Sequence, residues 1–275
     1  MRTKHAGRYP IVRRKGELER LHIQGAALEP DSAIMLDMIG VRSGWTCLDL
    51  GCGPSGITAL LSERVGKSGH VVGLDADPVF VEHAQKGAPA NVEFVRDDAY
   101  HSKLPSGSFD LVHSRFLAST AGEPEALLRE AIRLVRAGGT VALQEPDLAT
   151  LNCYPSHQAW ERLKSALERA FTSVGANVRL AQHLFPLMRH AGLEDVQYRP
   201  FVLGVRSSDP MTDYLPSTVE SLRSTIIEAG LMTENDLNAT LADCRSHLRA
   251  PDTVFTTYTV AQVWGRTGKK NNTTP

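Results

Sequence analysis

A glycine-rich turn constrains the fold of this chain more than any other feature of its sequence. Gly51, Gly53 and Gly56 follow the GxGxxG spacing, in which missing side chains let the backbone pass close to a nucleotide. The turn follows a short, mostly apolar run at 45–50 and precedes apolar residues at helical spacing over 57–65. Glycines between a strand and a helix predict a nucleotide-binding α/β sheet.

Two carboxylates indicate which nucleotide binds at this turn. Asp75 ends the next apolar run, about 20 residues beyond Gly53, which is the spacing at which an acidic group meets ribose hydroxyls. Asp49 lies two residues before the first glycine, where it would repel the pyrophosphate of a dinucleotide. The ammonium and sulfonium of S-adenosylmethionine would be attracted instead. The charge therefore favours a cationic cofactor.

Five segments in order resemble the class I S-adenosylmethionine-dependent methyltransferases. The resemblance is strongest to the bacterial small-molecule group, methyltransferase types 11 and 25, which includes the menaquinone and ubiquinone C-methyltransferases. It covers roughly residues 45–147, and Ser55 departs from it where the family often has a further glycine. The matching segments are 49–54, 73–78, 92–99, 108–115 and 134–140.

The resemblance implies a set of cofactor contacts. Asp98 and Ala99 should meet the adenine, and the N-terminal helix should close over the cofactor. On that helix Arg20 and Gln24 share one face at i, i+4, which suits Arg20 to the methionine carboxylate and Gln24 to a nearby polar group. The remaining cofactor positions expected from the motifs are Gly51, Cys52, Gly53, Ala76, Ser114 and Arg115.

The fold expected is a Rossmann-like, doubly wound sheet of the α/β class. Strands at 45–50, 70–74, 92–95, 109–113 and 140–144 alternate with helices, which requires a mostly parallel sheet covered on both faces. Helices are expected at 17–28, 31–39, 159–174 and 179–191. By resemblance, strands at 194–205 and 253–264 complete seven strands with an antiparallel edge.

This interpretation divides the chain into consecutive parts. They are an N-terminal helical arm (1–40), a cofactor-binding half (41–148), helices with the sixth strand (149–207), a helical lid over the substrate pocket (208–250), the last strand (251–266) and a disordered tail (267–275). At 275 residues, with 42% hydrophobic content, the chain can bury a full core.

The composition of the chain indicates which binding partners and which cellular compartment to expect. A formal net charge of −1 gives no reason to expect nucleic acid, whose phosphates attract concentrated Lys and Arg. We find no run of about 18 apolar residues and no secretory signal, so we expect a cytoplasmic protein that binds no membrane. The four cysteines form no CxxC pair and no HxxxH occurs, so no metal is expected. The sequence is compatible with a monomer or a homodimer.

Methyl transfer to a small molecule is the function expected, with oxygen, nitrogen or carbon as the acceptor atom. Displacement at a sulfonium needs mainly proximity and alignment, and a general base only if the acceptor must lose a proton. Candidates for that base are His113, Glu145, Asp147, Tyr154 and His157. Two other functions stay open, namely a binding, assembly or non-methylating protein on the same fold and an NAD-dependent oxidoreductase.

Overall fold

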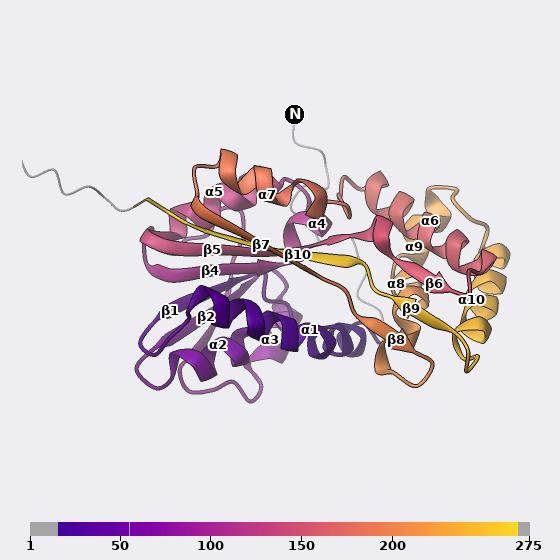
Figure 1. The fold of residues 1–275 in the computed structure, drawn as a ribbon, viewed down its shortest axis with the longest axis horizontal. Helices are drawn as coiled ribbons and strands as arrows, with labels where there is room; N and C mark the ends of the chain where they lie inside the picture. Colours follow the sequence, from indigo (N-terminus) through magenta and orange to yellow (C-terminus); the bar gives the residue numbers. More distant parts are fainter. Residues whose placement is uncertain (1–15, 55, 269–275) are drawn as a thin grey trace, which may run out of the picture.

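A twisted seven-stranded sheet forms the centre of the molecule, with a smaller unit at one end (Figure 1). The computed structural model describes residues 16–54 and 56–268. The strand order is β3-β2-β1-β4-β5-β10-β7, and β10 runs antiparallel to both of its neighbours. The strands are β1 (Thr46–Leu50), β2 (His70–Asp75), β3 (Val92–Arg96), β4 (Phe109–Arg115), β5 (Val135–Asp147), β7 (Glu194–Phe201) and β10 (Thr259–Arg266). The predicted seven-stranded α/β fold is therefore confirmed.

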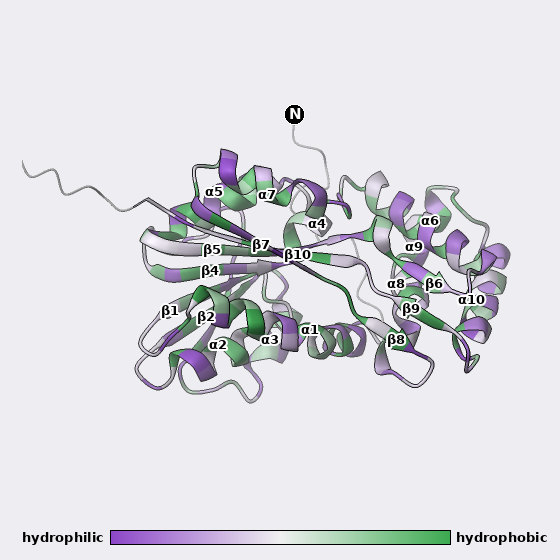
Figure 2. Ribbon diagram, in the orientation of Figure 1, coloured by the Kyte–Doolittle hydropathy of each residue, from purple (hydrophilic) through white to green (hydrophobic). Residues whose placement is uncertain are grey.

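Helices cover both faces of this sheet, as the strand order requires. One face carries α1 (Glu17–Ile39), α2 (Thr58–Val65) and α3 (Pro78–Gln85), and the other carries α4 (Leu117–Ala121), α5 (Pro124–Leu134) and α7 (Ala181–His190). Met35 and Leu61 pack against the first face, and Leu128 and Met188 pack against the second. The outer helices alternate between hydrophobic and hydrophilic residues, which is clear along α5 and α10 in Figure 2. The apolar side of α5 is buried on the sheet, and that of α10 packs against α6 in the smaller unit.

The smaller unit has a hydrophobic core of its own. Four helices pack beside a three-stranded sheet in the order β6-β9-β8. Trp160 is fully buried there, with its ring 5.0 Å from that of Phe255. The elements are β6 (Asn152–Tyr154), α6 (Gln158–Ser173), β8 (Gly204–Arg206), α8 (Tyr214–Ser221), α9 (Arg223–Glu228), α10 (Glu234–Leu248) and β9 (Val254–Thr256), with short 3-10 turns at Leu148–Thr150 and Pro210–Asp213.

The first helix differs from its expected form. Separate helices at 17–28 and 31–39 were expected, but α1 is continuous and Pro30 lies inside it. Proline removes one backbone hydrogen bond from a helix interior. Leu28 before it and Met35 after it are both fully buried, so packing on each side holds the helix together. Expected features at 1–15 and 269–275, including most of the tail, lie outside the described residues.

The expected strands at 194–205 and 253–264 were wrong as single strands. The first passes from β7 of the large sheet into β8 of the small one, and the second returns from β9 of the small sheet into β10. The two breaks face each other: Thr257 N donates to Leu203 O (2.9 Å), and Leu203 N donates to Thr257 Oγ1 (3.0 Å). The strands on both sides of each break are rich in apolar and β-branched residues. The sequence therefore gives no sign of where one strand ends and the next begins. β6 was not expected. The remaining domain boundaries stay predictions.

The central sheet should dominate stability. Val141 on β5 is fully buried, whereas Val254 on β9 is 42% exposed. Val141→Ala should lower the free energy of unfolding by about 2 kcal/mol, through lost burial and the cavity left behind. The same change at Val254 should alter it by less than about 0.5 kcal/mol. Urea unfolding of both variants tests this, and equal losses would contradict it.

Candidate functional site

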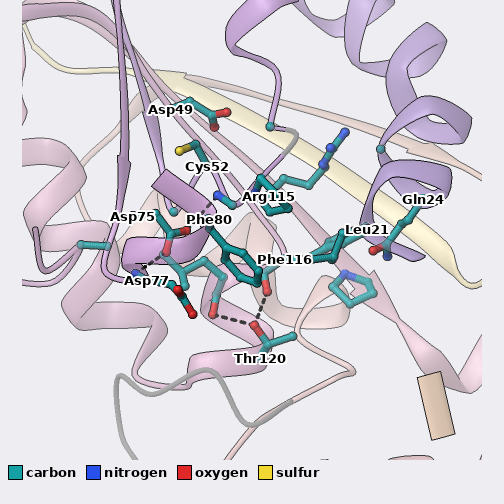
Figure 3. Close-up of a pocket in the computed structure, with 18 of the residues that line it drawn as sticks. Leu21, Gln24, Asp49, Cys52, Asp75, Asp77, Phe80, Arg115, Phe116 and Thr120 are labelled. Carbon is teal, nitrogen blue, oxygen red and sulfur yellow. Dashed lines mark hydrogen bonds between the residues drawn. The ribbon is translucent and has the colours of Figure 1, made fainter. Parts of the chain in front are cut away.

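A cavity of about 540 Å³ opens at the carboxyl ends of β1, β2 and β4. The turn after β1 and the ends of β2 and β4 form one wall, α1 forms another, and α6 and α8 of the smaller unit contribute a third. In a parallel sheet this edge is where ligands bind, because the strand ends and the helix N-termini meet there. Figure 3 shows part of its lining.

The glycine turn has the backbone that its spacing predicts. Gly51 and Gly53 have φ of 76° and 58°, in the left-handed region that favours glycine. The N–H groups of Gly51 and Cys52 both donate to Leu74 O, at 2.7 and 2.9 Å. A Cβ on Gly51 would lie 2.6 Å from Leu117 Cδ2, and one on Gly56 would overlap the Asp49 carboxylate. The turn thus closes around Asp49, and Gly53 leaves open space beside the cavity.

Asp49 lies at the base of the cavity and is only 2% exposed. Its Oδ2 accepts a hydrogen bond from Ile57 N (2.8 Å), and its Oδ1 lies 2.8 Å from His113 Nδ1. A buried carboxylate needs such partners. Both of its oxygens are held by groups of the protein.

Asp75 lies at the end of β2, where both of its oxygens face backbone N–H groups. Oδ2 accepts from Gly53 N and Oδ1 from Asp77 N, each at 2.8 Å. Burial raises the pKa of Asp75, and these two hydrogen bonds offset part of that rise. Asp98, whose Oδ1 accepts from Tyr100 N, lines the cavity next to Ala99.

Charge is unevenly distributed in the cavity. Four carboxylates line one half, and Figure 3 shows Asp49, Asp75 and Asp77 on the same side as Cys52, across from Leu21 and Gln24. Burial beside Asp49 and Asp75 raises the pKa of the Cys52 thiol well above its usual range. This thiol is a small buried side chain without nucleophilic character. The acidic half suits a cationic ligand.

The two arginines of the lining differ in their partners. Arg20 is 7% exposed and donates to Glu17 through Nε (2.9 Å) and Nη2 (2.7 Å). Arg115 makes one side-chain hydrogen bond among the described residues, a long one of 3.4 Å from Nη1 to Ser32 Oγ. Burial lowers the pKa of Arg115, and nearby Asp49 acts in the opposite direction. Arg115 therefore has donors left to bind an anion.

The other half of the cavity is apolar and aromatic. A small polar cluster interrupts it: Gln24 Nε2 donates to Tyr258 Oη (2.8 Å), and Tyr214 Oη donates to Tyr258 Oη (3.1 Å). Burial raises the pKa of both tyrosines. No motif in the sequence pointed to either tyrosine. The apolar lining is Phe116, Leu148, Leu167, Phe171 and Val178.

The residues expected as candidate general bases differ in their position relative to the cavity. His113 borders the cavity but is 0% exposed, and its ring nitrogens face Asp49 and Gln144 at 2.8 Å. Glu145 is buried behind α4 and accepts from Ala118 N and Ser119 N at 3.1 Å. Asp147 accepts from Ala149 N and Gln182 Nε2. Neither Glu145 nor Asp147 lines the cavity.

Tyr154 and His157 lie outside this cavity altogether. Tyr154 is 53% exposed on β6, and His157 caps the N-terminus of α6, with its ring stacked 4.2 Å from that of His247. Ser114 is buried, its Oγ has no hydrogen-bond partner among the described residues, and it also does not line the cavity. The structure thus brings together the expected cofactor residues except Ser114, and it separates most of the expected bases from them.

Two further structural observations concern metal binding and membrane insertion. Within residues 16–54 and 56–268, no group of three or more His, Cys, Asp or Glu side chains is placed to hold a metal ion. Over the same residues, no helix has the length and apolar character needed to cross a membrane.

Known proteins match the cofactor half most strongly. The methyltransferase-domain family matches residues 47–139. An uncharacterized 37.1 kDa protein of transposon TN4556 from Streptomyces fradiae is 35% identical over 45% of this chain and 36% of its own length. The demethylmenaquinone methyltransferase of Lactococcus lactis is 35% identical over 45% of this chain and 50% of its own length. This chain therefore spans half or less of the length of these two relatives.

A third relative and two solved structures cover more of the chain. The ubiquinone/menaquinone biosynthesis C-methyltransferase UbiE of Enterobacter sp. is 28% identical over 62% of this chain and 74% of its own length. A phosphoethanolamine N-methyltransferase of Haemonchus contortus has a TM-score of 0.53 at 16% identity, covering 87% of this chain and 53% of that one. The [4+2]-cyclase SpnF has a TM-score of 0.52 at 17% identity, covering 86% and 81%. The two structures share the fold.

The buried Glu145 should make stability depend on pH. Burial raises its pKa from a usual value near 4.5 to about 7. The folded protein then binds this proton more tightly than the unfolded chain, so its contribution is present below about pH 4.5 and is lost as pH rises through 7. Between pH 5 and 8 the stability of the wild type relative to Glu145→Gln should fall by about 2–3 kcal/mol. Urea unfolding across this range tests it, and parallel curves would contradict it.

Proposed function

This chain belongs to the class I S-adenosylmethionine-dependent methyltransferases, and we propose that it transfers a methyl group from S-adenosylmethionine to a small, largely apolar acceptor. One observation carries the proposal: a glycine turn and four carboxylates line half of a 540 Å³ cavity whose other half is apolar. Such a cavity has room for a cationic nucleoside beside a second small molecule.

The residues of the acidic half fit the parts of the cofactor one by one. Asp49 would hold the ammonium by charge, and Asp75 has lone pairs left to accept from the ribose hydroxyls. Asp98 and Ala99 would meet the adenine. The open backbone of Gly51 and Gly53 would admit the methionine part. S-adenosylmethionine supplies a methyl group already activated on a sulfonium.

Arg115 suits the methionine carboxylate better than Arg20 does. Arg20 is already paired with Glu17, which also accepts from Ser221 Oγ at 2.9 Å. Arg115 stands at the end of β4, next to the strand that carries Asp49. A guanidinium and a carboxylate on adjacent strand ends match the two charges of an amino acid. We therefore assign the carboxylate to Arg115.

The acceptor would lie in the apolar half, where proximity supplies most of the catalysis. Phe116, Leu167 and Phe171 exclude water, and the Gln24–Tyr258–Tyr214 cluster offers hydrogen bonds to orient a polar group. Among the described lining residues of this half, the ionisable side chains other than Arg20 and Arg115 are tyrosines with raised pKa. An acceptor that attacks with its own lone pair, or that arrives as an anion, fits this lining.

The charge and the thiols support the rest of the proposal. A small molecule rather than nucleic acid is supported by the formal net charge of −1. All four cysteines are free and buried, which suits the reducing cytoplasm.

Calorimetric titration with S-adenosylmethionine, S-adenosylhomocysteine and NADH separates the three candidate functions. Binding of the first two, followed by methylation of a screened acceptor detected by mass spectrometry, supports the proposal. Binding without methylation of any acceptor favours a non-methylating protein, a function consistent with the fold that a [4+2]-cyclase shares. Binding of NADH alone would contradict the proposal and favour an oxidoreductase. We do not expect this outcome, because Asp49 would repel the pyrophosphate of NADH.

Asp75→Ala should weaken S-adenosylhomocysteine binding about 10- to 100-fold, because charge-assisted hydrogen bonds to the ribose are lost. Asp97→Ala is a matched control. Asp97 also accepts from two backbone N–H groups, those of Asp98 and Lys103, but does not line the cavity. Calorimetry on both variants measures the difference, and equal weakening would refute the assignment of Asp75.

Arg115→Gln should weaken S-adenosylhomocysteine binding by about tenfold or more, since a charged partner of the carboxylate is lost. Binding of 5′-methylthioadenosine, which has no carboxylate, should change little. Arg20→Gln is the comparison and should spare the preference for S-adenosylhomocysteine. If instead Arg20→Gln abolished that preference and Arg115→Gln kept it, the carboxylate would belong to Arg20.

A further inference from the structure

A single line of hydrogen-bonded side chains crosses five adjacent strands of the large sheet. Asp49, His113, Gln144, Gln262 and Arg199 stand on β1, β4, β5, β10 and β7, which are consecutive in the strand order. The Asp49–His113, His113–Gln144 and Gln144–Gln262 links are each 2.8 Å, and the Gln262–Arg199 link is 2.7 Å. We call these five residues the relay.

The two ends of the relay fix the direction of every link. The guanidinium of Arg199 has only donors, so Gln262 must turn its Oε1 toward it and its Nε2 toward Gln144. Gln144 must then present its own Oε1 to Gln262 and its Nε2 to His113. Rotating either amide by half a turn would set two donors or two acceptors against each other.

The direction of the links determines where His113 carries its proton. Nε2 faces a donor, the amide of Gln144, so it must be the unprotonated acceptor. Nδ1 therefore holds the proton and donates it in a hydrogen bond to Asp49 Oδ1. A ring protonated on both nitrogens would direct an N–H against the Gln144 N–H. One tautomer of His113 is compatible with the relay.

We propose that Arg199, Gln262 and Gln144 are positioning residues, which fix the Nδ1–H tautomer of His113 and so hold the Asp49 carboxylate toward the cofactor ammonium. The role of Asp49 rests on the proposed function, whereas the tautomer rests on the relay alone. Without this tautomer Asp49 would keep Ile57 N as a partner but face a lone pair on Nδ1. The remote arginine thereby acts on the cofactor site across four hydrogen bonds.

Burial makes the relay sensitive to any change in its links. His113, Gln144 and Gln262 are all 0% exposed, so water cannot replace a lost partner. Helix α1 covers the relay: Arg199 Nη2 donates to Asp31 Oδ1 (2.6 Å), and Gln144 Nε2 donates to Ser32 Oγ (3.1 Å). The cover and the relay are therefore one connected network.

The first test is direct observation of His113 in the full-length wild-type protein. Long-range proton–nitrogen NMR spectra of protein labelled with ¹⁵N-histidine show which ring nitrogen bears the proton, and His113→Asn identifies the signal by its loss. We expect Nδ1 protonated and Nε2 unprotonated. A proton on Nε2, alone or together with one on Nδ1, would overturn the proposal.

The second test reverses the direction of the hydrogen bonds in the relay by a substitution that does not touch His113. Gln262→Glu keeps an acceptor for Arg199 but presents an oxygen to Gln144, so the Gln144 amide should rotate, turn its Oε1 toward His113 and place a proton on Nε2. Arg199→Lys, which is again a donor without an acceptor, should keep the wild-type tautomer. Gln197→Glu on exposed β7 is the matched control for the added charge. An unchanged tautomer in folded Gln262→Glu would overturn the proposal.

Cofactor binding separates positioning from general damage to the fold. Gln262→Glu should weaken S-adenosylhomocysteine binding about 10- to 100-fold and leave 5′-methylthioadenosine, which lacks the ammonium, within about twofold of wild type. Equal weakening of both ligands would overturn the proposed link to Asp49. If wild-type protein binds neither S-adenosylmethionine nor S-adenosylhomocysteine, the proposed function fails, and the NMR result alone decides the relay.

Discussion

The burial of one carboxylate organises the functional end of this protein. Asp49 stands next to the carboxyl end of the central strand β1 with 2% of its surface exposed, and an ion in that position must have hydrogen-bond donors on every side. The glycine turn supplies a backbone N–H, and the neighbouring strand supplies an imidazole. A Cβ on Gly56 would overlap the carboxylate, so the turn can approach it only as glycine. The motif serves the carboxylate as well as the ligand.

This requirement extends through the sheet because each partner is itself buried. His113 needs an amide as its partner, and that amide needs a second amide. The series ends at Arg199 on the edge strand β7, whose side chain is 22% exposed. The result is a polar line through an otherwise hydrophobic layer, in which each side chain has its partner. Buried networks of this kind favour one arrangement over all others, since every alternative leaves a donor or an acceptor unpaired.

Much of the cofactor half could be predicted from the sequence, because local rules determine it. The turn at Gly51 and Gly53 and the strand-end positions of Asp49, Asp75 and Asp98 depend on short-range spacing. The apolar half of the cavity depends on contacts distant in sequence: Gln24 meets Tyr258 across 234 residues, and no local pattern contains that pair. Candidate bases such as Glu145 and His157 follow the expected fifth strand in the sequence. A position after a strand does not determine whether a side chain faces a cavity, a helix or solvent.

The connection between the two sheets determines how this protein can diversify. Phe201 of β7 pairs directly with Val260 of β10, so residues 202–258 leave and re-enter the large sheet at opposing positions. The ends of that segment are held together by the sheet whatever lies between them, and lengthening such a closed loop has a small entropic cost. Tyr214, Thr218 and Tyr258 all belong to it. Homologues can therefore exchange or extend this excursion, and with it part of the chamber wall, while the strands that hold the nucleotide pocket keep their register.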